Sequence, residues 1–225
     1  MKTKQLTKGE QTRTKILERV NTFYNEQGVD HTIARLAEET GMGKSRMTNY
    51  FPKKEHLIFS LLVQYEKLLA SLMSKHQYDK GISDFQQFIP LMSDIIDLMF
   101  KYRGVISYAM VNPGMDHEIF KHLKENYADN KDRIRNRLNN FIRHGLIRKD
   151  LLDPDTFEDY YFQYMCISSS WIISHNLLEA EKPLETVRPR YIRSIMCCMK
   201  PYLTEKGRAN MEAALDKLNQ IQTQD

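Results

Sequence analysis

Six side chains able to hydrogen-bond to nucleic acid fall within seven consecutive positions, which are followed closely by a proline and two lysines. Arginine and lysine pair with guanine, and asparagine with adenine, at base edges in the major groove of DNA. Lysines just beyond such a segment neutralise backbone phosphates. The spacing therefore predicts a base-reading segment followed by a phosphate-binding pair. The residues are Lys44, Ser45, Arg46, Thr48, Asn49, Tyr50, Lys53 and Lys54.

Three predicted helices position this segment. The first begins at a capping-box pattern, Thr7-Lys8-Gly9-Glu10, and continues at helical spacing to Gly28. Thr32 caps a short second helix, and Gly41 then permits a sharp turn before a third helix over residues 44–51. Two short helices joined by a glycine-containing turn of about three residues have the spacing of a helix-turn-helix.

The alternative interpretation is that these lysines and arginines form an ordinary solvated face. Two observations favour nucleic acid instead. Met47 and Phe51 lie four residues apart and are predicted to turn inward, which would hold the third helix against the first two. Residues 1–54 also carry 11 lysines and arginines against 6 acidic residues, although the net charge of the whole chain is only +4. The basic region is therefore the candidate for nucleic-acid contact.

The same region resembles the TetR-type (TetR/AcrR) transcriptional regulators over about the first 60 residues. The resemblance implies homodimers that bind near-palindromic double-stranded operator DNA, and an unknown small-molecule effector that releases it, with repression as the usual outcome. The residues that carry it are Thr12-Arg13-Thr14-Lys15-Ile16-Leu17, Phe23, Gly28-Val29, Thr32, Leu36-Ala37-Glu38-Glu39-Thr40-Gly41, Lys44 and Tyr50-Phe51-Pro52-Lys53-Lys54-Glu55-His56-Leu57.

The resemblance also implies a role for individual residues. Thr32, Tyr50 and Lys54 are expected to contact phosphates, although Thr32 has a structural role as an N-cap in either case. The residues expected to face bases or nearby phosphates are Lys44, Ser45, Arg46 and Thr48.

Three positions at the third helix depart from the family pattern. Gly43 stands where the family usually has a capping serine, so this end is predicted to be weakly capped. Thr48 stands where an aromatic residue is common, which shortens the reach into the groove. Arg46 replaces a commonly small residue and offers a bidentate guanine contact instead. The operator sequence is therefore not expected to match that of relatives.

The rest of the chain predicts an all-α fold, with a three-helix DNA-binding domain over residues 1–54 and a larger helical ligand-sensing and dimerisation domain over residues 55–225. Periodic apolar positions predict helices at 53–72, 83–102, 105–111, 116–144, 155–178, 188–200 and 204–222. Pro189 near the start of one helix suggests that Arg188 is a loop residue. Whether helix 204–222 packs on its own domain or on a partner is left open.

A dimer interface is predicted where the penultimate long helix pairs with the next one across a two-fold axis. The first contributes an aromatic face from Phe157 to Leu178 that includes Trp171, and the second contributes residues from Tyr191 to Lys200. The side chains of the second helix named for this interface are Ile192, Ile195, Met196 and Met199.

The effector pocket is poorly located by the sequence, because methionines and aromatic residues line cavities and fill cores alike. For His175, a satisfied interface histidine is the alternative to a ligand contact. The candidates are Phe100, Tyr108, Met110, Tyr127, Phe141, Tyr164, Met165, Trp171 and His175.

The sequence offers no enzyme or metal site, and no cofactor is expected. His117 and His122 lie five residues apart rather than the four of a zinc-protease helix, so their side chains diverge. Cys197 and Cys198 are interpreted as free buried thiols, with a redox pairing to Cys166 as the alternative. Glu125, Asp129, Arg133 and Arg137 are spaced four apart and are interpreted as a solvated helix surface.

No apolar leader and no uninterrupted run of about 18 apolar residues are present, so a cytoplasmic protein is expected. Two other functions fit parts of the sequence. One is a helical metabolite-binding protein or enzyme in which the basic N-terminal bundle is scaffold. The other is an architectural DNA-binding protein that is indifferent to sequence.

Overall fold

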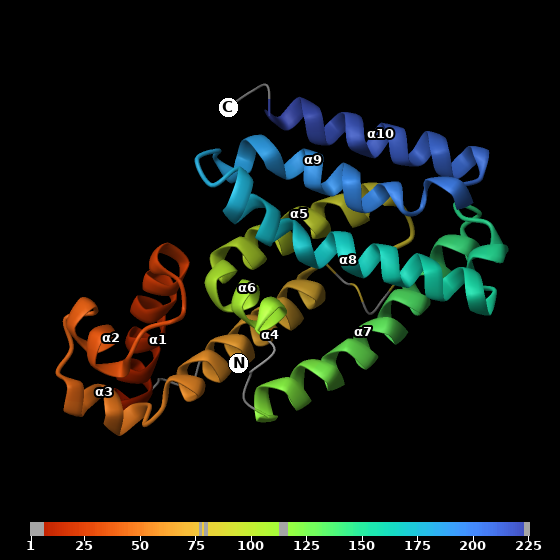
Figure 1. Cartoon of the computed structure of the whole chain (residues 1–225). Coiled ribbons are helices and arrows are strands. Elements are labelled where there is room, and N and C mark those ends of the chain that lie inside the picture. The colour runs from red at the N-terminus through yellow and green to blue at the C-terminus, as the bar shows by residue number, and fades with distance from the viewer. Residues whose placement is uncertain (1–6, 77, 79–80, 113–116, 223–225) are drawn as a thin grey trace. The chain divides into compact units, whose positions relative to one another are not determined.

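The computed structural model describes residues 7–76, 78, 81–112 and 117–222, and for residues 127, 128 and 220–222 it describes the backbone alone. Within these residues every regular element is a helix, which confirms the all-α expectation (Figure 1). The α-helices are α1 (Lys8–Gln27), α2 (Ile33–Glu39), α3 (Lys44–Tyr50), α4 (Lys54–Lys75), α5 (Phe85–Lys101), α6 (Arg103–Val111), α7 (His117–Arg143), α8 (Pro154–Leu178), α9 (Leu184–Cys197) and α10 (Glu205–Gln222), with short 3-10 helices η2 (Lys149–Leu152) and η3 (Lys200–Tyr202). Asp116, where the sequence predicts the start of α7, lies outside the described residues.

The chain forms two compact units, and neither is a single stretch of sequence. The first contains Met1–Leu68 together with Met99–Ile119, and the second contains Leu69–Leu98 together with Phe120–Asp225. α6 therefore joins the N-terminal helices, although about 50 residues separate it from α3. The functional boundary expected after residue 54 stays a prediction.

α1 forms as its capping pattern predicts. The amide of Glu10 donates to the Thr7 hydroxyl at 3.2 Å, and the Thr7 amide donates back to the Glu10 carboxylate at 2.8 Å. These bonds satisfy two amides that the helix itself leaves free, and they lower the pKa of Glu10 because they favour its charged form. Gly28 ends the helix with a φ of 80°, a conformation that favours glycine.

A close junction between α1 and α6 organises the first unit. The side-chain amides of Asn21 and Asn25 both donate to the carbonyl of Lys101 at 2.8 Å, and the Gly104 amide donates to the Asn25 side-chain oxygen at 2.9 Å. Any Cβ at position 104 would overlap the carbonyl of Tyr24 and lie 3.0 Å from the amide nitrogen of Asn25. Glycine is therefore required here for close packing.

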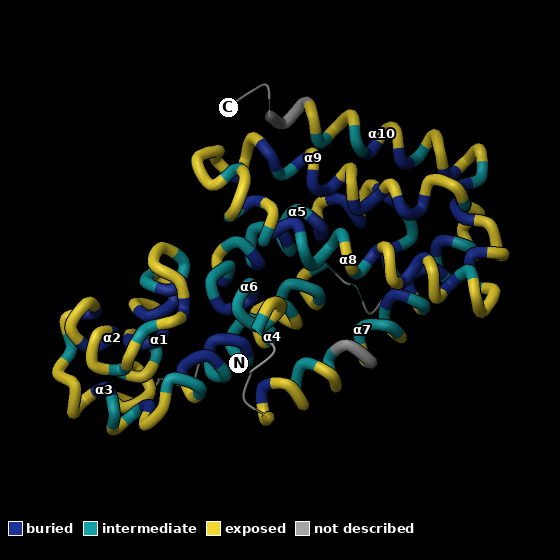
Figure 2. The backbone as a smooth tube through the Cα atoms, in the orientation of Figure 1, coloured by how far each residue is buried: buried dark blue, intermediate teal, exposed yellow. Residues whose placement is uncertain are grey.

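α4 is long and apolar enough, by composition alone, to cross a membrane. Charged residues such as Glu66 and Lys67 interrupt it, and its first half packs in the core of the first unit. The buried residues are Leu57, Ile58, Leu61 and Leu62. In Figure 2 dark blue marks the buried stretches of α4. These features are those of an amphipathic core helix.

The second unit is held by aromatic contacts between helices. Phe141 of α7 contacts Phe85 and Phe88 of α5, with ring centroids 4.9 and 5.8 Å apart. Trp171 of α8 contacts Tyr191 of α9 at 4.9 Å between centroids. Such pairs add to the stabilisation that burial of the rings provides.

The last helix, α10, packs on its own chain, which answers the question left open above. The Thr204 hydroxyl donates to the carbonyl of Gly145 at 2.7 Å and places the start of α10 beside the end of α7. Met211 and Ala214 are buried, and Arg193 of α9 donates to Asn219 at 2.9 Å. α10 therefore completes the core of the second unit.

One predicted helix boundary is wrong. α9 begins at Leu184 rather than Arg188, and Arg188 lies inside the helix, where it forms an ion pair with Asp97 of α5 at 2.7 Å. Pro183 occupies the N-cap, so Pro189 is the sixth helical residue rather than one of the first. Proline removes one backbone hydrogen-bond donor at this position. The helix still forms, because the apolar side chains buried around Pro189 offset the loss of that hydrogen bond.

We expect Gly104→Ala to lower the free energy of unfolding by about 1–3 kcal/mol, because the added Cβ must displace the backbone of α1. Urea unfolding followed by circular dichroism measures this loss. Gly43→Ala is the matched control, because no atom lies within 4 Å of its added Cβ. Equal stability of the two variants would contradict the tight junction.

Candidate nucleic-acid interface

The turn between α2 and α3 is built by side-chain caps and one glycine. The Thr32 hydroxyl accepts from the Arg35 amide at 3.3 Å and begins α2, and the Thr40 hydroxyl donates to the Leu36 carbonyl at 2.6 Å near its end. Gly41 has a φ of 64°, and the Met42 amide donates to the Ala37 carbonyl at 2.8 Å. This geometry confirms that α2 and α3 form the predicted helix-turn-helix.

α3 is anchored by the two residues that the sequence predicts to turn inward. Met47 and Phe51 are both fully buried in the first unit. The guanidinium of Arg13 lies 5.0 Å from the centre of the Phe51 ring and donates to the Ser60 hydroxyl of α4 at 2.7 Å. The sequence did not reveal this positioning role, because it identifies Arg13 only as one residue of the family pattern.

A second arginine of α1 supports the turn itself. Arg19 donates to the carbonyl of Thr40, the C-cap residue of α2, at 2.6 Å. A cation at a helix C-terminus compensates the carbonyls that lack a partner within the helix. No sequence signal distinguishes Arg19 from the other exposed cations of α1.

The outward side of α3 presents the predicted base-reading groups. Lys44, Ser45, Arg46 and Asn49 are exposed, and Arg46 makes one weak hydrogen bond, at 3.4 Å, to the Thr12 hydroxyl. A helix of seven residues is about 10 Å long and fits a major groove about 12 Å wide. The four side chains are therefore free to reach a ligand outside the protein.

Thr48 differs from these four residues. Its side chain is half-buried, and its hydroxyl lies 3.1 Å from the carbonyls of Lys44 and Ser45, to which it donates. This local bonding occupies the donor that a phosphate contact would need. Gly43 occupies the N-cap without a side-chain hydrogen bond, as its departure from the family pattern predicts.

The candidate phosphate contacts surround the end of α3. Thr32 and Lys53 are exposed, and Tyr50 is half-buried. The Lys54 ammonium lies 3.1 Å from a carboxylate oxygen of Asp30 and is 23% exposed, whereas Asp30 is fully exposed. Within the described residues, Lys44, Arg46 and Lys53 take part in no such ion pair. These three cations are therefore available to an anionic partner.

Comparison with known proteins gives the family. A family model described as a bacterial transcriptional repressor, TetR, matches residues 64–211, which is more than half of the chain. This chain belongs to the TetR family. The matched residues lie after the helix-turn-helix, in the part of the chain where sequence reasoning found only a similar layout of helices. Among proteins with curated descriptions, none matches the sequence.

Solved structures of TetR regulators share the fold at low sequence identity. A TetR-family transcriptional regulator from Marinobacter aquaeolei VT8 has a TM-score of 0.78 and 18% identity, with 92% of this chain and 98% of that chain covered. An ArpA-like gamma-butyrolactone receptor has a TM-score of 0.69 and 15% identity, with 95% of this chain and 99% of that chain covered. A SmeT–triclosan complex has a TM-score of 0.58 and 12% identity, with 87% of this chain and 93% of that chain covered.

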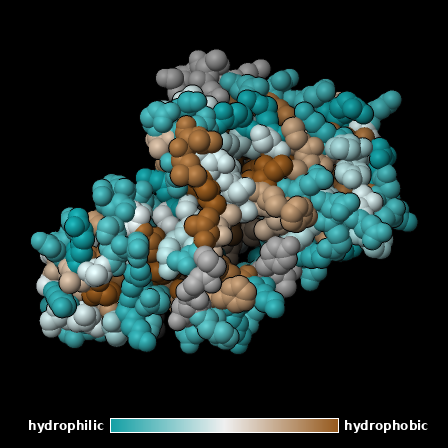
Figure 3. Space-filling view, viewed as in Figure 1, coloured by the Kyte–Doolittle hydropathy of each residue, from teal (hydrophilic) through white to brown (hydrophobic). Residues whose placement is uncertain are grey.

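The side chains predicted to form the dimer interface are not at the surface, so this part of the prediction is wrong. Phe157, Trp171, Ile192, Ile195, Met196 and Met199 are all buried inside the second unit of a single chain, so they have no surface to offer a partner. α8 carries apolar residues on both sides, and the larger aromatic side fills the core. Its large exposed apolar residues are Phe162, Leu177 and Leu178. In Figure 3 brown, apolar side chains reach the surface in the region where Figure 1 draws the end of α8.

The nine candidate ligand residues are scattered between the two units and stay a prediction. Phe100, Tyr108 and Met110 belong to the first unit, and Arg103 lies over the Phe100 ring at 4.5 Å. In the second unit, Phe141, Tyr164, Trp171 and His175 are buried, Met165 is half-buried and the Tyr127 side chain lies outside the described residues. His175 contacts the Tyr191 hydroxyl at 3.1 Å, which is the bonding of a satisfied buried histidine.

Two smaller interpretations are also wrong. Arg137, assigned to a solvated surface, is buried, although Glu125 and Asp129 of the same helix are exposed as expected. Cys198 is buried as expected, but Cys197 is exposed, because neighbours on a helix point about 100° apart. The part of the chain that the structure describes holds no cluster of three or more histidine, cysteine or acidic residues suited to a metal.

We expect Met47→Ala to destabilise the first unit by about 2–5 kcal/mol, because it leaves a cavity beneath α3. Arg46→Ala on the same helix is the control and is expected to change stability by less than about 0.5 kcal/mol, since its side chain is exposed. Thermal and urea unfolding measure both. A small effect of Met47→Ala would show that α3 is not held by this contact.

Proposed function

We propose that this TetR-family protein is a cytoplasmic homodimeric repressor that binds a near-palindromic operator through α3 and is released by a small-molecule effector. The observation that supports this most directly is the division of α3 into two sides. Met47 and Phe51 are buried, whereas Lys44, Ser45, Arg46 and Asn49 are exposed and polar. A helix held in this way keeps its outward groups at fixed positions, which base recognition requires.

The contacts divide into base reading and phosphate binding. Arg46 and Asn49 have the side chains suited to bidentate contacts with guanine and adenine, and Lys44 and Ser45 serve bases or nearby phosphates. Thr32, Tyr50, Lys53 and Lys54 serve backbone phosphates. Thr48 stays in the interface but points its hydroxyl at its own helix, so we assign it a van der Waals role. Lys54 exchanges Asp30 for a phosphate when DNA binds.

We assign dimerisation to the outward side of α8. Phe162 and Leu177 are 68% and 76% exposed, and they lie on the opposite side of the helix from the buried Trp171 and His175. Exposed apolar side chains of this size on a long helix are typical of a subunit interface. A two-fold axis would then present two α3 helices to the two halves of a palindrome.

The effector is a small molecule that the second unit binds. One structural relative is a gamma-butyrolactone receptor and another was solved as a complex with triclosan, so this fold accepts different small ligands.

Selection from a random pool of duplex DNA tests the whole proposal. Enrichment of one palindrome with half-sites about one helical turn apart, or slightly more, is the expected result. Uniform recovery of all sequences would instead indicate an architectural DNA-binding protein, and no recovery at any salt concentration would leave the N-terminal bundle as scaffold. Both results would overturn the proposal.

Arg46→Ala is expected to lower discrimination at one base pair of each half-site by about 1–3 kcal/mol, because the bidentate contact is lost. Lys54→Ala is the comparison, and it should weaken binding to all sequences alike and reduce the salt slope by about one unit. Fluorescence anisotropy with a panel of single-base operator variants measures both. Unchanged selectivity of Arg46→Ala would show that this side chain reads no base.

Leu177→Asp is expected to raise the dissociation constant of the dimer at least tenfold, roughly the effect of burying an unpaired charge at an apolar interface. Phe120→Asp, which replaces a 60% exposed aromatic residue of α7, is the control and should leave the dimer intact. Sedimentation velocity over a range of protein concentrations gives the constants. A dimer unaffected by Leu177→Asp would place the interface elsewhere.

A further inference from the structure

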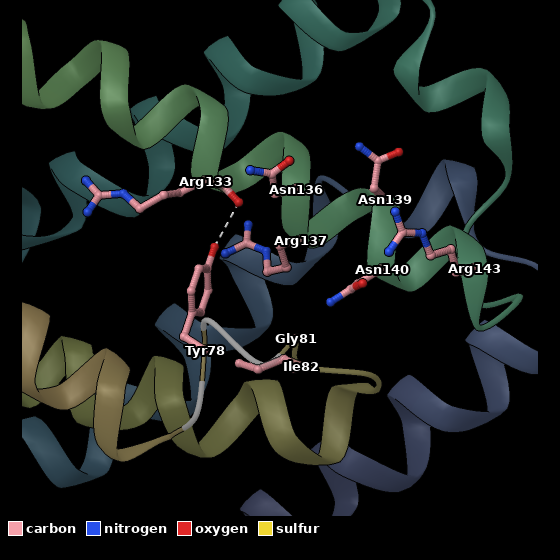
Figure 4. Close-up of a pocket in the computed structure, with 9 residues that line it drawn as sticks. All are labelled: Tyr78, Gly81, Ile82, Arg133, Asn136, Arg137, Asn139, Asn140 and Arg143. Atoms are coloured by element: carbon pink, nitrogen blue, oxygen red, sulfur yellow. Dashed lines mark hydrogen bonds between the residues drawn. The ribbon is translucent and has the colours of Figure 1, made fainter.

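A cavity of about 440 Å³ in the second unit lies between α7 and three residues that precede α5, Tyr78, Gly81 and Ile82 (Figure 4). Tyr78 and Gly81 line one side, and the second half of α7 lines the other with arginines and asparagines. The Tyr78 hydroxyl donates to the carbonyl of Arg133 at 2.9 Å and ties the two sides together. Sequence reasoning did not place a site here.

The lining is strongly basic. Three arginines, Arg133, Arg137 and Arg143, line the cavity, and its described lining residues include no aspartate or glutamate. Asn140 adds a side-chain amide beside them. Because residues three, four and seven apart share one side of a helix, α7 gathers these groups along a single stripe. The cavity therefore concentrates positive charge without an acidic partner from the described residues.

Arg137 is the decisive residue. It is only 7% exposed, and its guanidinium lies over the rings of Phe88 and Tyr164 at 4.4 and 5.1 Å. Its Nε and Nη2 atoms are buried and donate no hydrogen bond within the structure described. In Figure 4 the side chain reaches from α7 toward Tyr78, at one side of the cavity. Arginine stays charged in proteins, so this buried cation leaves two donor atoms unbonded, and no acidic residue among the described residues that line the cavity pairs with it.

Such an arrangement is costly unless something occupies the cavity. A buried charge without a partner destabilises a fold, and leaving guanidinium donors unbonded adds to that cost. The faces of the Phe88 and Tyr164 rings offset part of it but carry no formal negative charge. A carboxylate or a phosphate supplies both the negative charge and paired acceptor oxygens that match a guanidinium fork.

We propose that this cavity binds the oxyanion group of a small molecule, a carboxylate or a phosphate ester, and that this anion is the effector. Arg137 holds the oxyanion within the cavity, Arg143 contributes charge at the exposed mouth, and Asn140 donates from its side-chain amide. In Figure 4 the Arg133 side chain extends away from these groups. Arg133 therefore contributes mainly through its backbone carbonyl, which accepts a hydrogen bond from the Tyr78 hydroxyl. The assignment of an effector role depends on the proposed DNA-binding function, whereas the anion site itself does not.

Binding of three matched probes to the DNA-free protein tests the site. The probes are phenyl phosphate, benzoate and the neutral benzyl alcohol, each measured by thermal shift and calorimetry at constant ionic strength. At least one of the two anions is expected to bind and raise Tm, and the alcohol is not. Whichever anion binds more tightly identifies the source of the oxyanion group. Equal binding of the alcohol, or no binding of either anion, would overturn the proposal.

Arg137→Gln is expected to weaken anion binding at least about tenfold, because the charge-assisted hydrogen bonds are lost. Arg135→Gln is the control on the same helix, since its guanidinium lies 3.9 Å over the Phe157 ring and does not line the cavity. Arg143→Gln, at an exposed position, gives a second test that does not depend on the fold of the core and should weaken binding by a smaller factor. Unchanged binding in both Arg137→Gln and Arg143→Gln would contradict the site.

The effector role is tested by measuring whether the anion releases the protein from its operator. The anion should weaken DNA binding of the unaltered protein and of Arg135→Gln, and should leave Arg137→Gln bound at the same ionic strength. Arg137-dependent anion binding in a protein that binds no DNA would refute the DNA-binding function and retain the site. Intact operator binding without any anion binding would refute the site and retain the function.

Discussion

Burial of Met47 and Phe51 is the interaction on which the proposed activity depends. A helix of seven residues is not stable alone in water, because the cost of starting a helix exceeds what so few hydrogen bonds return. These two side chains give α3 the tertiary contact it lacks. Arg13 covers the Phe51 ring from α1, and Arg19 holds the end of α2, so the first helix acts as a support for the second and third.

The same support gives specificity its physical basis. A base-reading side chain discriminates only if its backbone stays in place while the wrong base is offered, since a mobile helix would adjust to either. The Asn21, Asn25 and Gly104 junction fixes α1 against α6 in turn. The exposed groups of α3 therefore depend on the burial of Met47 and Phe51 and on the hydrogen bonds that hold α1 in the first unit.

Cations in this chain follow two different physical regimes. Lys44, Arg46 and Lys53 remain hydrated when DNA is absent, so their charge costs little and is available for phosphates or bases. Arg137 has lost most of its water and faces a cavity instead. No described acidic residue lines that cavity, so the proposed anion would supply the negative charge that the described lining lacks.

The sequence by itself determined the local features of this protein. Thr7, Thr32 and Gly41 specify caps and a turn through interactions within a few residues, and the four-residue spacing of Met47 and Phe51 identifies a buried side whatever lies against it. The helix-turn-helix, its exposed candidate contacts and the all-α class could therefore be predicted, and the helix boundaries were correct to within a few residues except at α9.

Only the tertiary structure decided which of several apolar or charged faces is buried. α8 is apolar on both sides, so nothing local showed that Trp171 belongs to the chain's own core and Leu177 to its surface. Arg137 continues a ladder of charges that is exposed at Glu125 and Asp129, yet aromatic rings from α5 and α8 cover it. Burial depends on what other helices bring, and those partners lie far away in the sequence.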